Sequence, residues 1–156
     1  MSQENVEIVR DSVRAFAEGG LAAMAQFWAA DIDWRAIEGA PDDVGEIRGP
    51  EALRGYFQDW IDTFDDIDLV VGELRDAGDG RVVATQHVTG RAKGERGRNG
   101  ARYAVVYTVR GGKIVRGREY IDHVALEAAG LRELAMSQGE HRSRAAGVRG
   151  HQRARH

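Results

Sequence analysis

Three side chains able to move a proton stand on segments that alternate like β-strands. Glu119 and Asp122 follow a glycine turn in "RGGKIVRGREYID", and His87 lies in "VVATQHVTG". A carboxyl or imidazole group acts as a general acid or base when it is placed beside a reacting atom. The same residue types also serve as solvated charges or structural hydrogen-bond partners. The register of the strands decides between these roles.

The loop between the predicted strands 101–110 and 113–122 sets which side chains share a face, because a shift of one residue moves every side chain to the other face. A two-residue loop, Gly111-Gly112, groups the two tyrosines at 103 and 107 with arginines. A three-residue loop that starts at Arg110 is also common. This second register groups Tyr103, Val105, Tyr107 and Val109 with Val115, Gly117, Glu119 and Ile121. We prefer it because it separates polar from apolar side chains better.

In the preferred register, Glu119 is one acid among aliphatic and tyrosine side chains. Burying an unpaired carboxylate is costly, so Glu119 should find a partner or have a raised pKa. Such a group is a candidate for acid–base catalysis, and a purely structural hydrogen bond is the alternative. Asp122 falls on the opposite, arginine-rich face, where ion pairing or helix capping explains it more simply. Asp122 is the rival candidate if the register is wrong.

Residues 81–90 have two possible inward faces. If Val82, Ala84 and Val88 face inward, Gln86 points into a pocket and His87 points out. If the other face is turned inward, His87 becomes a candidate catalytic residue. Most lone histidines on strands are structural or exposed, and both orientations remain open.

The elements that position these residues begin with helices and continue with strands. An i, i+3/i+4 stripe with Val6, Val9 and Val13 predicts a first helix that stops at Gly19-Gly20. A second short helix extends from residue 21 to Trp28, residues 31–38 form a strand, and residues 39–49 form a loop. A third helix starts at Pro50 and includes the residues up to 64 in its apolar pattern.

The remaining pattern predicts strands at about 67–75, 81–90, 101–110 and 113–122, and a short helix at 124–135. Helices followed by antiparallel strands indicate the α+β class, with the helices covering one face of a curved sheet. Aromatic residues Trp34, Tyr56 and Trp60 belong to the core and would also line a pocket in such a fold. The hydroxyl groups of Tyr103 and Tyr107 would orient a polar ligand, or the two rings would pack across the hairpin.

Composition fits one globular domain without thiol chemistry. The chain has 156 residues, 42% of them hydrophobic, and no cysteine. Residues 137–156 contain five arginines and one glutamate, which gives this segment a charge of +4. Because the net charge of the chain is −3, residues 1–136 have a charge of −7. We therefore expect a domain at 1–136 that does not bind nucleic acid, followed by a disordered basic tail at 137–156.

Other partners and cofactors find no support in the sequence. No stretch approaches the roughly 18 apolar residues of a membrane span, and the first ten residues are polar, so we expect a cytoplasmic protein that does not contact membranes. His87 and His123 are far apart, and no His/Asp/Glu cluster has the spacing of metal ligands. The glycine-rich segment 90–100 joins two strands, unlike a phosphate-binding loop. We expect neither a metal nor another cofactor.

Several strings resemble the SnoaL-like branch of the nuclear-transport-factor-2-like superfamily. They are "NVEIVRDSVRAFAEGGLAAMAQFWAADIDWR", "IRGPEALRGYFQDWIDTF", "DAGDGRVVATQHVTGRAKG" and "VYTVRGGKIVRGREYIDHVALEAAGL", and the likeness covers roughly residues 4–131. The resemblance implies a cone: a strongly bent antiparallel sheet around a central pocket, closed by N-terminal helices. It also implies a homodimer formed through the sheet.

The same resemblance implies a cofactor-independent cyclase, isomerase or epoxide hydrolase that acts on a small apolar carbonyl or cyclic compound. In such enzymes an acid on the last strand acts on the ligand, and Glu119 matches that role best, with Asp122 second. Many relatives carry a histidine on the preceding strand, where "AVVYTVRGGK" has Val105. The alternative is a non-catalytic ligand-binding or dimerisation module with the same pocket.

Overall fold

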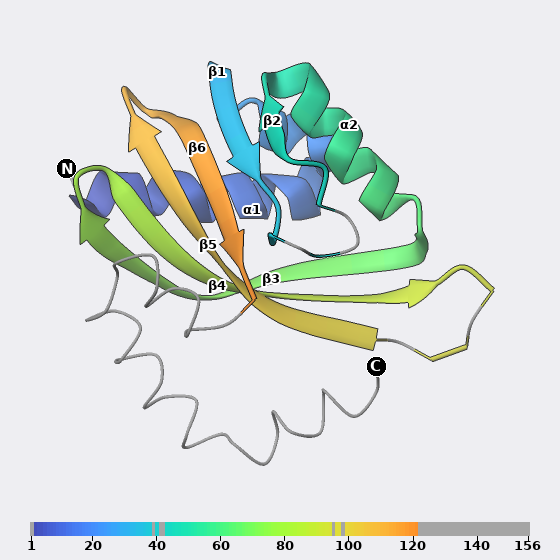
Figure 1. Ribbon diagram of the computed structural model, residues 1–156. Coiled ribbons are helices and arrows are strands. Elements are labelled where there is room, and N and C mark those ends of the chain that lie inside the picture. The colour runs from blue at the N-terminus through green and yellow to red at the C-terminus, as the bar shows by residue number, and fades with distance from the viewer. Residues whose placement is uncertain (1, 39, 41–42, 95, 98, 122–156) are drawn as a thin grey trace.

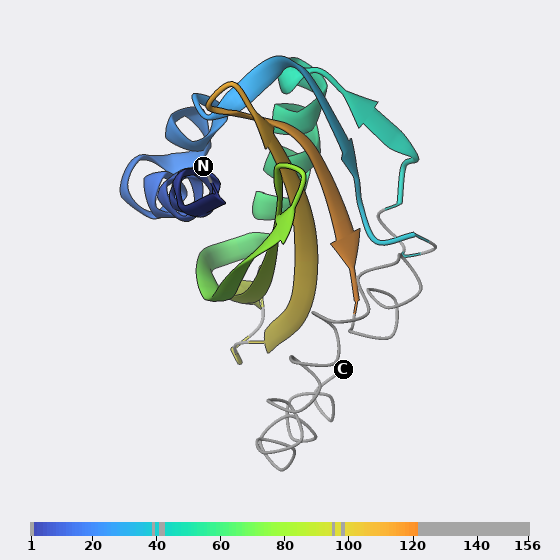
Figure 2. The ribbon, with the colours of Figure 1, turned by 90° about the vertical axis from the view of Figure 1, so that its left-hand side faces the viewer.

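The structure is a computed structural model that describes residues 2–38, 40, 43–94, 96–97 and 99–121. The elements in this part of the chain are α1 (Ser2–Ala25), β1 (Trp28–Arg35), β2 (Glu46–Arg48), α2 (Pro50–Ile61), β3 (Phe64–Gly78), β4 (Arg81–Ala92), β5 (Asn99–Arg110) and β6 (Lys113–Tyr120). The strands form one sheet in the order β2-β1-β6-β5-β4-β3. Figures 1 and 2 show that this sheet is strongly bent. The predicted α+β class is confirmed.

Both helices pack on the inner face of the sheet through their apolar stripes. Val9 of α1 and Leu53 of α2 are fully buried, in one cluster with Val82 and Val105 of the sheet. The predicted break at Gly19-Gly20 is a kink: Gly20 has φ 80° and ψ −168° inside α1. A side chain would be strained at this φ, so glycine allows the helix to change direction there. Within the described residues, no helix is both long and apolar enough to cross a membrane.

Two aromatic residues that we assigned to helices lie on strands instead. Trp28 begins β1 rather than ending the second helical segment, and Phe64 begins β3 rather than extending α2. Bulky aromatic side chains favour the half-buried surface of a sheet. Apolar spacing alone therefore extended both predicted helices too far.

The first strand confirms one prediction and corrects two. Trp34, which we assigned to the core, is buried, and so is Ile32 on the same side of the strand. However, β1 pairs parallel with β6, so the sheet is not wholly antiparallel. In addition, β2 lies within the predicted loop 39–49. A three-residue strand is too short to show an alternating pattern.

The hairpin between β5 and β6 combines features of both registers. Arg110 pairs with Lys113, so the loop is Gly111-Gly112, and our preference for a three-residue loop is wrong. Both glycines have positive φ, as tight two-residue hairpin turns require. The pairing then shifts by one residue, because Val109 pairs with Ile114 but Thr108 pairs with Arg116.

This β-bulge at residue 115 restores the predicted faces farther along the hairpin. Val105 pairs with Glu119, and Tyr107 pairs with Gly117, so these residues share the face that the preferred register gave them, although their pairing partners differ. Next to the turn, however, Ile114 rather than Val115 joins the core. The predicted helix 124–135, the tail 137–156, Asp122 and His123 lie outside the described residues.

Candidate functional site

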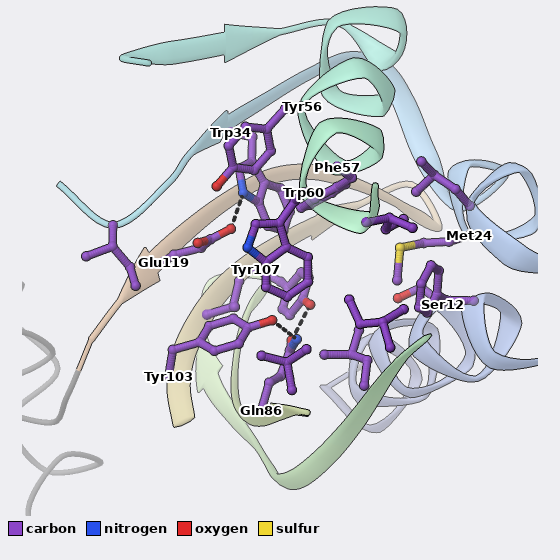
Figure 3. Close-up of a pocket in the computed structure, with 18 of the residues that line it drawn as sticks. Ser12, Met24, Trp34, Tyr56, Phe57, Trp60, Gln86, Tyr103, Tyr107 and Glu119 are labelled. Carbon is purple, nitrogen blue, oxygen red and sulfur yellow. Dashed lines mark hydrogen bonds between the residues drawn. The ribbon is translucent and has the colours of Figure 1, made fainter. Parts of the chain in front are cut away.

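A cavity of about 230 Å³ lies between the inner face of the sheet and the two helices (Figure 3). Eight of the eleven aromatic residues of the chain line it: Phe16, Trp28, Trp34, Tyr56, Phe57, Trp60, Tyr103 and Tyr107. The remaining lining residues are mostly aliphatic, with a few polar side chains such as Gln86 and Glu119. All the residues that we predicted as ligand contacts lie on this wall.

The volume limits what the cavity can hold. It exceeds the roughly 150 Å³ of an apolar cavity that binds benzene. It is smaller than the roughly 300–1,000 Å³ of sites for drug-sized ligands. The space therefore suits a compound of one or two rings.

Glu119 projects from β6 into this cavity. Trp34 Nε1 donates a hydrogen bond of 2.8 Å to Glu119 Oε2, across the parallel pairing of β1 with β6 (Figure 3). The inward orientation predicted for Glu119 is thus present in the structure. Of the two outcomes expected for an inward acid, Glu119 has at least found a hydrogen-bond partner.

The indole of Trp34 is held in place by its neighbours. Its ring packs edge-on against Phe57 at 5.4 Å and against Tyr107 at 5.8 Å between ring centroids. It also lies over Gly117, its pairing partner on β6, where an added Cβ would come within 2.1 Å of Trp34 Cζ3. Gly117 is therefore needed for its small size, because the ring occupies the space of a side chain.

A second polar group in the cavity joins β4 to β5. Gln86 is only 3% exposed, and its Nε2 donates a 3.1 Å hydrogen bond to the Tyr103 hydroxyl oxygen. The Tyr107 hydroxyl donates to Gln86 Oε1. Figure 3 shows both hydrogen bonds, with the amide between the two rings. The amide thereby links two tyrosines that stand on the same face of β5.

Both tyrosines remain neutral over the ordinary pH range. Burial raises the pKa of Tyr103 above its usual value, and the negative charge of Glu119 raises it further, against a smaller opposing effect of Gln86. Burial also raises the pKa of Tyr107, with additional contributions from Tyr103 and Glu119. These hydroxyl groups are therefore proton-bearing hydrogen-bond donors.

His87 lies on the other face of β4. It pairs with Val70 of β3 and Arg102 of β5, and it is not among the residues that line the cavity. This is the first of the two orientations considered for residues 81–90, with Gln86 turned inward. The position of His87 gives no support to a role at the cavity, and Asp122 lies outside the described residues.

Sequence reasoning missed two polar lining residues, Arg102 of β5 and Ser12 of α1. Ser12 is the one that lies on a helix. Its side chain is buried, and its hydroxyl donates a 2.8 Å hydrogen bond to the carbonyl oxygen of Val9. Ser12 stands three residues after Val9, so the helical spacing of the inward stripe contained the signal. The hydroxyl group is already used within the helix.

The outer face of β6 carries arginines that the preferred register placed away from the core. Arg118 lies 3.5 Å from Asp33 of the adjacent strand β1 and 3.3 Å from Glu46 of β2, the strand beyond it. These charges are therefore balanced at the edge of the sheet rather than in the cavity. Across the described residues, no group of three or more His, Asp or Glu side chains is arranged to hold a metal ion.

The family model of the SnoaL-like domain matches residues 9–117. The chain therefore belongs to the SnoaL-like family, as the sequence resemblance indicated. No curated protein sequence matches the chain significantly.

Solved structures support the same assignment. A nuclear-transport-factor-2-like protein from Burkholderia xenovorans LB400 is 30% identical, with 83% of this chain and 97% of that chain covered and a TM-score of 0.61. A protein from Jannaschia sp. CCS1 described as a SnoaL-like polyketide cyclase is 16% identical, with 81% and 91% covered and a TM-score of 0.62. A Mycobacterium tuberculosis protein in complex with estradiol-17β-hemisuccinate is 17% identical, with 75% and 92% covered and a TM-score of 0.64. The last two show the fold alone.

Proposed function

We propose that the protein is a cofactor-independent acid–base enzyme that acts on a small, mostly apolar carbonyl or cyclic compound. The observation that supports this proposal most strongly is the Glu119 carboxylate inside an aromatic cavity, oriented by Trp34 Nε1 at 2.8 Å. A carboxylate held in an apolar site is a well-placed proton acceptor for a bound ligand. The reaction would be an isomerisation, a cyclisation or the opening of an epoxide.

The proton transfer follows from the chemistry of a carboxylate beside a carbonyl compound. Glu119 takes a proton from the carbon next to the carbonyl group, and the C–H electrons form an enolate. Glu119 then returns the proton to the same carbon or to another one, so that the substrate is restored or isomerised. No electrons leave the substrate, and no redox partner is required.

The assignment to the SnoaL-like family agrees with this proposal. Among the structural neighbours, one is described as a polyketide cyclase, and another has a ketosteroid isomerase-like fold. The cavity of about 230 Å³ favours substrates of one or two rings. These features support a substrate class rather than a particular compound.

The proposal is tested with a panel of three compounds of this size: 2-indanone, a cyclic β,γ-unsaturated ketone and indene oxide. Nuclear magnetic resonance follows α-proton exchange, migration of the double bond and hydration, respectively. The wild-type protein should accelerate at least one reaction over buffer, and Glu119→Gln should remove most of that acceleration. Full turnover by Glu119→Gln would show that Glu119 is not the catalytic group.

A second candidate function is ligand binding without catalysis. Val105 pairs directly with Glu119 and stands where the resemblance places a histidine in many relatives. The acid therefore lacks the imidazole neighbour that position 105 would provide. This alternative predicts saturable binding of the panel compounds without acceleration of any of the three reactions.

A further inference from the structure

The two tyrosine hydroxyl groups that contact Gln86 have different roles in their hydrogen bonds. The amide has one oxygen, which accepts from Tyr107, and one nitrogen, which donates to Tyr103. A tyrosine hydroxyl can donate one proton and can also accept. Tyr107 has therefore used its proton, whereas Tyr103 acts as an acceptor from Gln86. Among the described residues, the Tyr103 hydroxyl group donates no hydrogen bond.

The two tyrosine hydroxyl groups have two protons to donate, and the amide accepts only one of them, whichever way its oxygen and nitrogen are placed. An amide between two hydroxyl groups accepts from one and donates to the other, so one of the two hydroxyl protons is always left over. With Tyr107 donating to Oε1, the remaining proton is that of Tyr103. Because Gln86 Nε2 approaches the Tyr103 oxygen at 3.1 Å, the proton is directed away from the amide. Both Tyr103 and Gln86 line the cavity.

We propose that Tyr103, oriented by Gln86, forms a subsite for a hydrogen-bond-accepting oxygen of the ligand. This inference rests on the proposed function of the cavity, and it narrows the ligand class. The ligand is a neutral compound of one or two rings with a carbonyl or similar acceptor oxygen. The Glu119 carboxylate disfavours a negative charge on the part of the ligand near β6, whereas Arg102 also belongs to the lining.

The subsite also assigns a direction to the bound ligand. Glu119 approaches from β6, while Tyr103 stands on β5 and Gln86 on β4. Figure 3 shows Glu119 with Trp34 and the Gln86–Tyr103 pair as separate polar groups on the wall. A ketone whose oxygen meets Tyr103 can turn its neighbouring C–H group toward Glu119. The hydroxyl group would then stabilise the negative charge that develops on the oxygen.

The test compares two ligands that differ only in the accepting atom: 2-indanone and 2-methyleneindane, in which a CH₂ group replaces the oxygen. Binding of each probe is measured by titration with isothermal calorimetry or tryptophan fluorescence, and the ratio of the two Kd values is the readout. A neutral hydrogen bond contributes about 0.5–1.5 kcal/mol, so the wild-type protein should prefer the ketone by roughly two- to tenfold.

Single-residue variants distinguish the hydrogen bond from Tyr103 to the ligand from the orientation of Tyr103 by Gln86. Tyr103→Phe should abolish the preference for the ketone. Tyr120→Phe is the matched control, because Tyr120 is on β6 and does not line the cavity, and the preference should be unchanged. Gln86→Met should lower the preference without abolishing it, because the Tyr103 hydroxyl group keeps its proton but loses the Nε2 donor that orients it.

The Gln86→Glu variant tests the orienting role of Gln86 through the pH dependence of the ratio of the two Kd values, which would not change if Gln86 only supported the structure. The protonated carboxyl group can donate to Tyr103, as the amide does, whereas the carboxylate can only accept and would take the Tyr103 proton. In this variant the preference for the ketone should therefore fall as the pH rises through the pKa of residue 86. The wild-type ratio should stay constant over the same range.

Three results would overturn the inference: failure of both probes to bind, equal binding of both probes by the wild-type protein, or a preference that survives in Tyr103→Phe. A Gln86→Glu ratio that does not change with pH would refute the orienting role of Gln86. These outcomes are distinguishable from failure of the proposed enzyme function. That function fails if the ketone binds with the expected preference but no reaction in the panel depends on Glu119.

Discussion

At the scale of single residues, the cavity is defined by two polar groups in an aromatic wall. Glu119 is bound by the indole of Trp34, and Gln86 is bound by two tyrosines. Each polar group therefore has a partner, and each partner also controls its orientation. The consequences of this arrangement can be measured one side chain at a time.

Trp34→Phe removes the Nε1–H donor and keeps an aromatic ring. A hydrogen bond to a charged group contributes about 1.5–3 kcal/mol, so misplacement of Glu119 should lower kcat for 2-indanone exchange by roughly tenfold or more. KM should change less, because the apolar wall is largely kept. Trp28→Phe, on the same strand, is the control and should leave kcat closer to that of the wild-type protein. Equal kcat values for Trp34→Phe and the wild-type protein would show that this hydrogen bond does not position the acid.

The raised pKa values of Tyr103 and Tyr107 predict a loss of stability in alkali. In the unfolded chain both hydroxyl groups ionise near pH 10, so below that pH their contribution is fully present. Above it the folded state binds more protons than the unfolded state, and each tyrosine costs about 1.4 kcal/mol per pH unit. Urea denaturation between about pH 9 and 11 should show this decline. The Tyr103→Phe/Tyr107→Phe double variant should show a shallower one, and equal slopes would contradict the assignment.

At the scale of elements, the position of Glu119 depends on how β6 pairs with its neighbours. The alternation on β5 and β6 was sufficient to predict that Glu119 faces inward with Tyr103 and Tyr107. The turn could not be predicted, because a two-residue loop with a bulge and a three-residue loop give the same faces beyond residue 115. The parallel pairing of β1 with β6 was also hidden, since pairing between strands far apart in the chain leaves no local pattern.

The pairing of β1 with β6 leaves no room for a side chain at Gly117, which lies against the Trp34 ring. In Gly117→Ala the new methyl group would overlap the Trp34 ring, so we expect a loss of about 1–3 kcal/mol in the free energy of unfolding. Gly55→Ala in α2 is the matched control, because nothing lies within 4 Å of its added Cβ. Alanine should be neutral or stabilise that helix by up to about 1 kcal/mol. Denaturation curves that give the same sign for both variants would contradict this role of Gly117.

At the scale of the whole molecule, the chain is a SnoaL-like fold whose inner face forms the cavity and whose outer face is partly apolar. Val83, Ala104 and Val106 form a second cluster on that side, next to Tyr120, and all three are already buried within the single chain. Val70 is 50% exposed and, from its pairing with His87, faces the same side. The cavity was expected from the family resemblance, whereas the ligand depends on polar geometry that no sequence pattern specifies.

We propose that this outer face pairs with a second copy of the chain, as the family resemblance implies. Light scattering coupled to size-exclusion chromatography should then give twice the chain mass of 17.2 kDa. A stable interface of this kind buries about 1,200–2,000 Å² in total, so the dimer should persist on dilution to micromolar concentration. A monomeric mass at every concentration tested would contradict the proposal.

The central claim is that Glu119 transfers the proton. It is tested most directly by the rate of α-deuterium exchange of 2-indanone in D₂O, with wild-type and Glu119→Gln proteins compared at equal ligand occupancy. General acid–base catalysis contributes about 10²–10⁴-fold, so the variant should bind the ketone but exchange it at least about 100 times more slowly. Exchange by bound 2-indanone at the same rate in both proteins would contradict the assignment of Glu119 as the catalytic acid–base group.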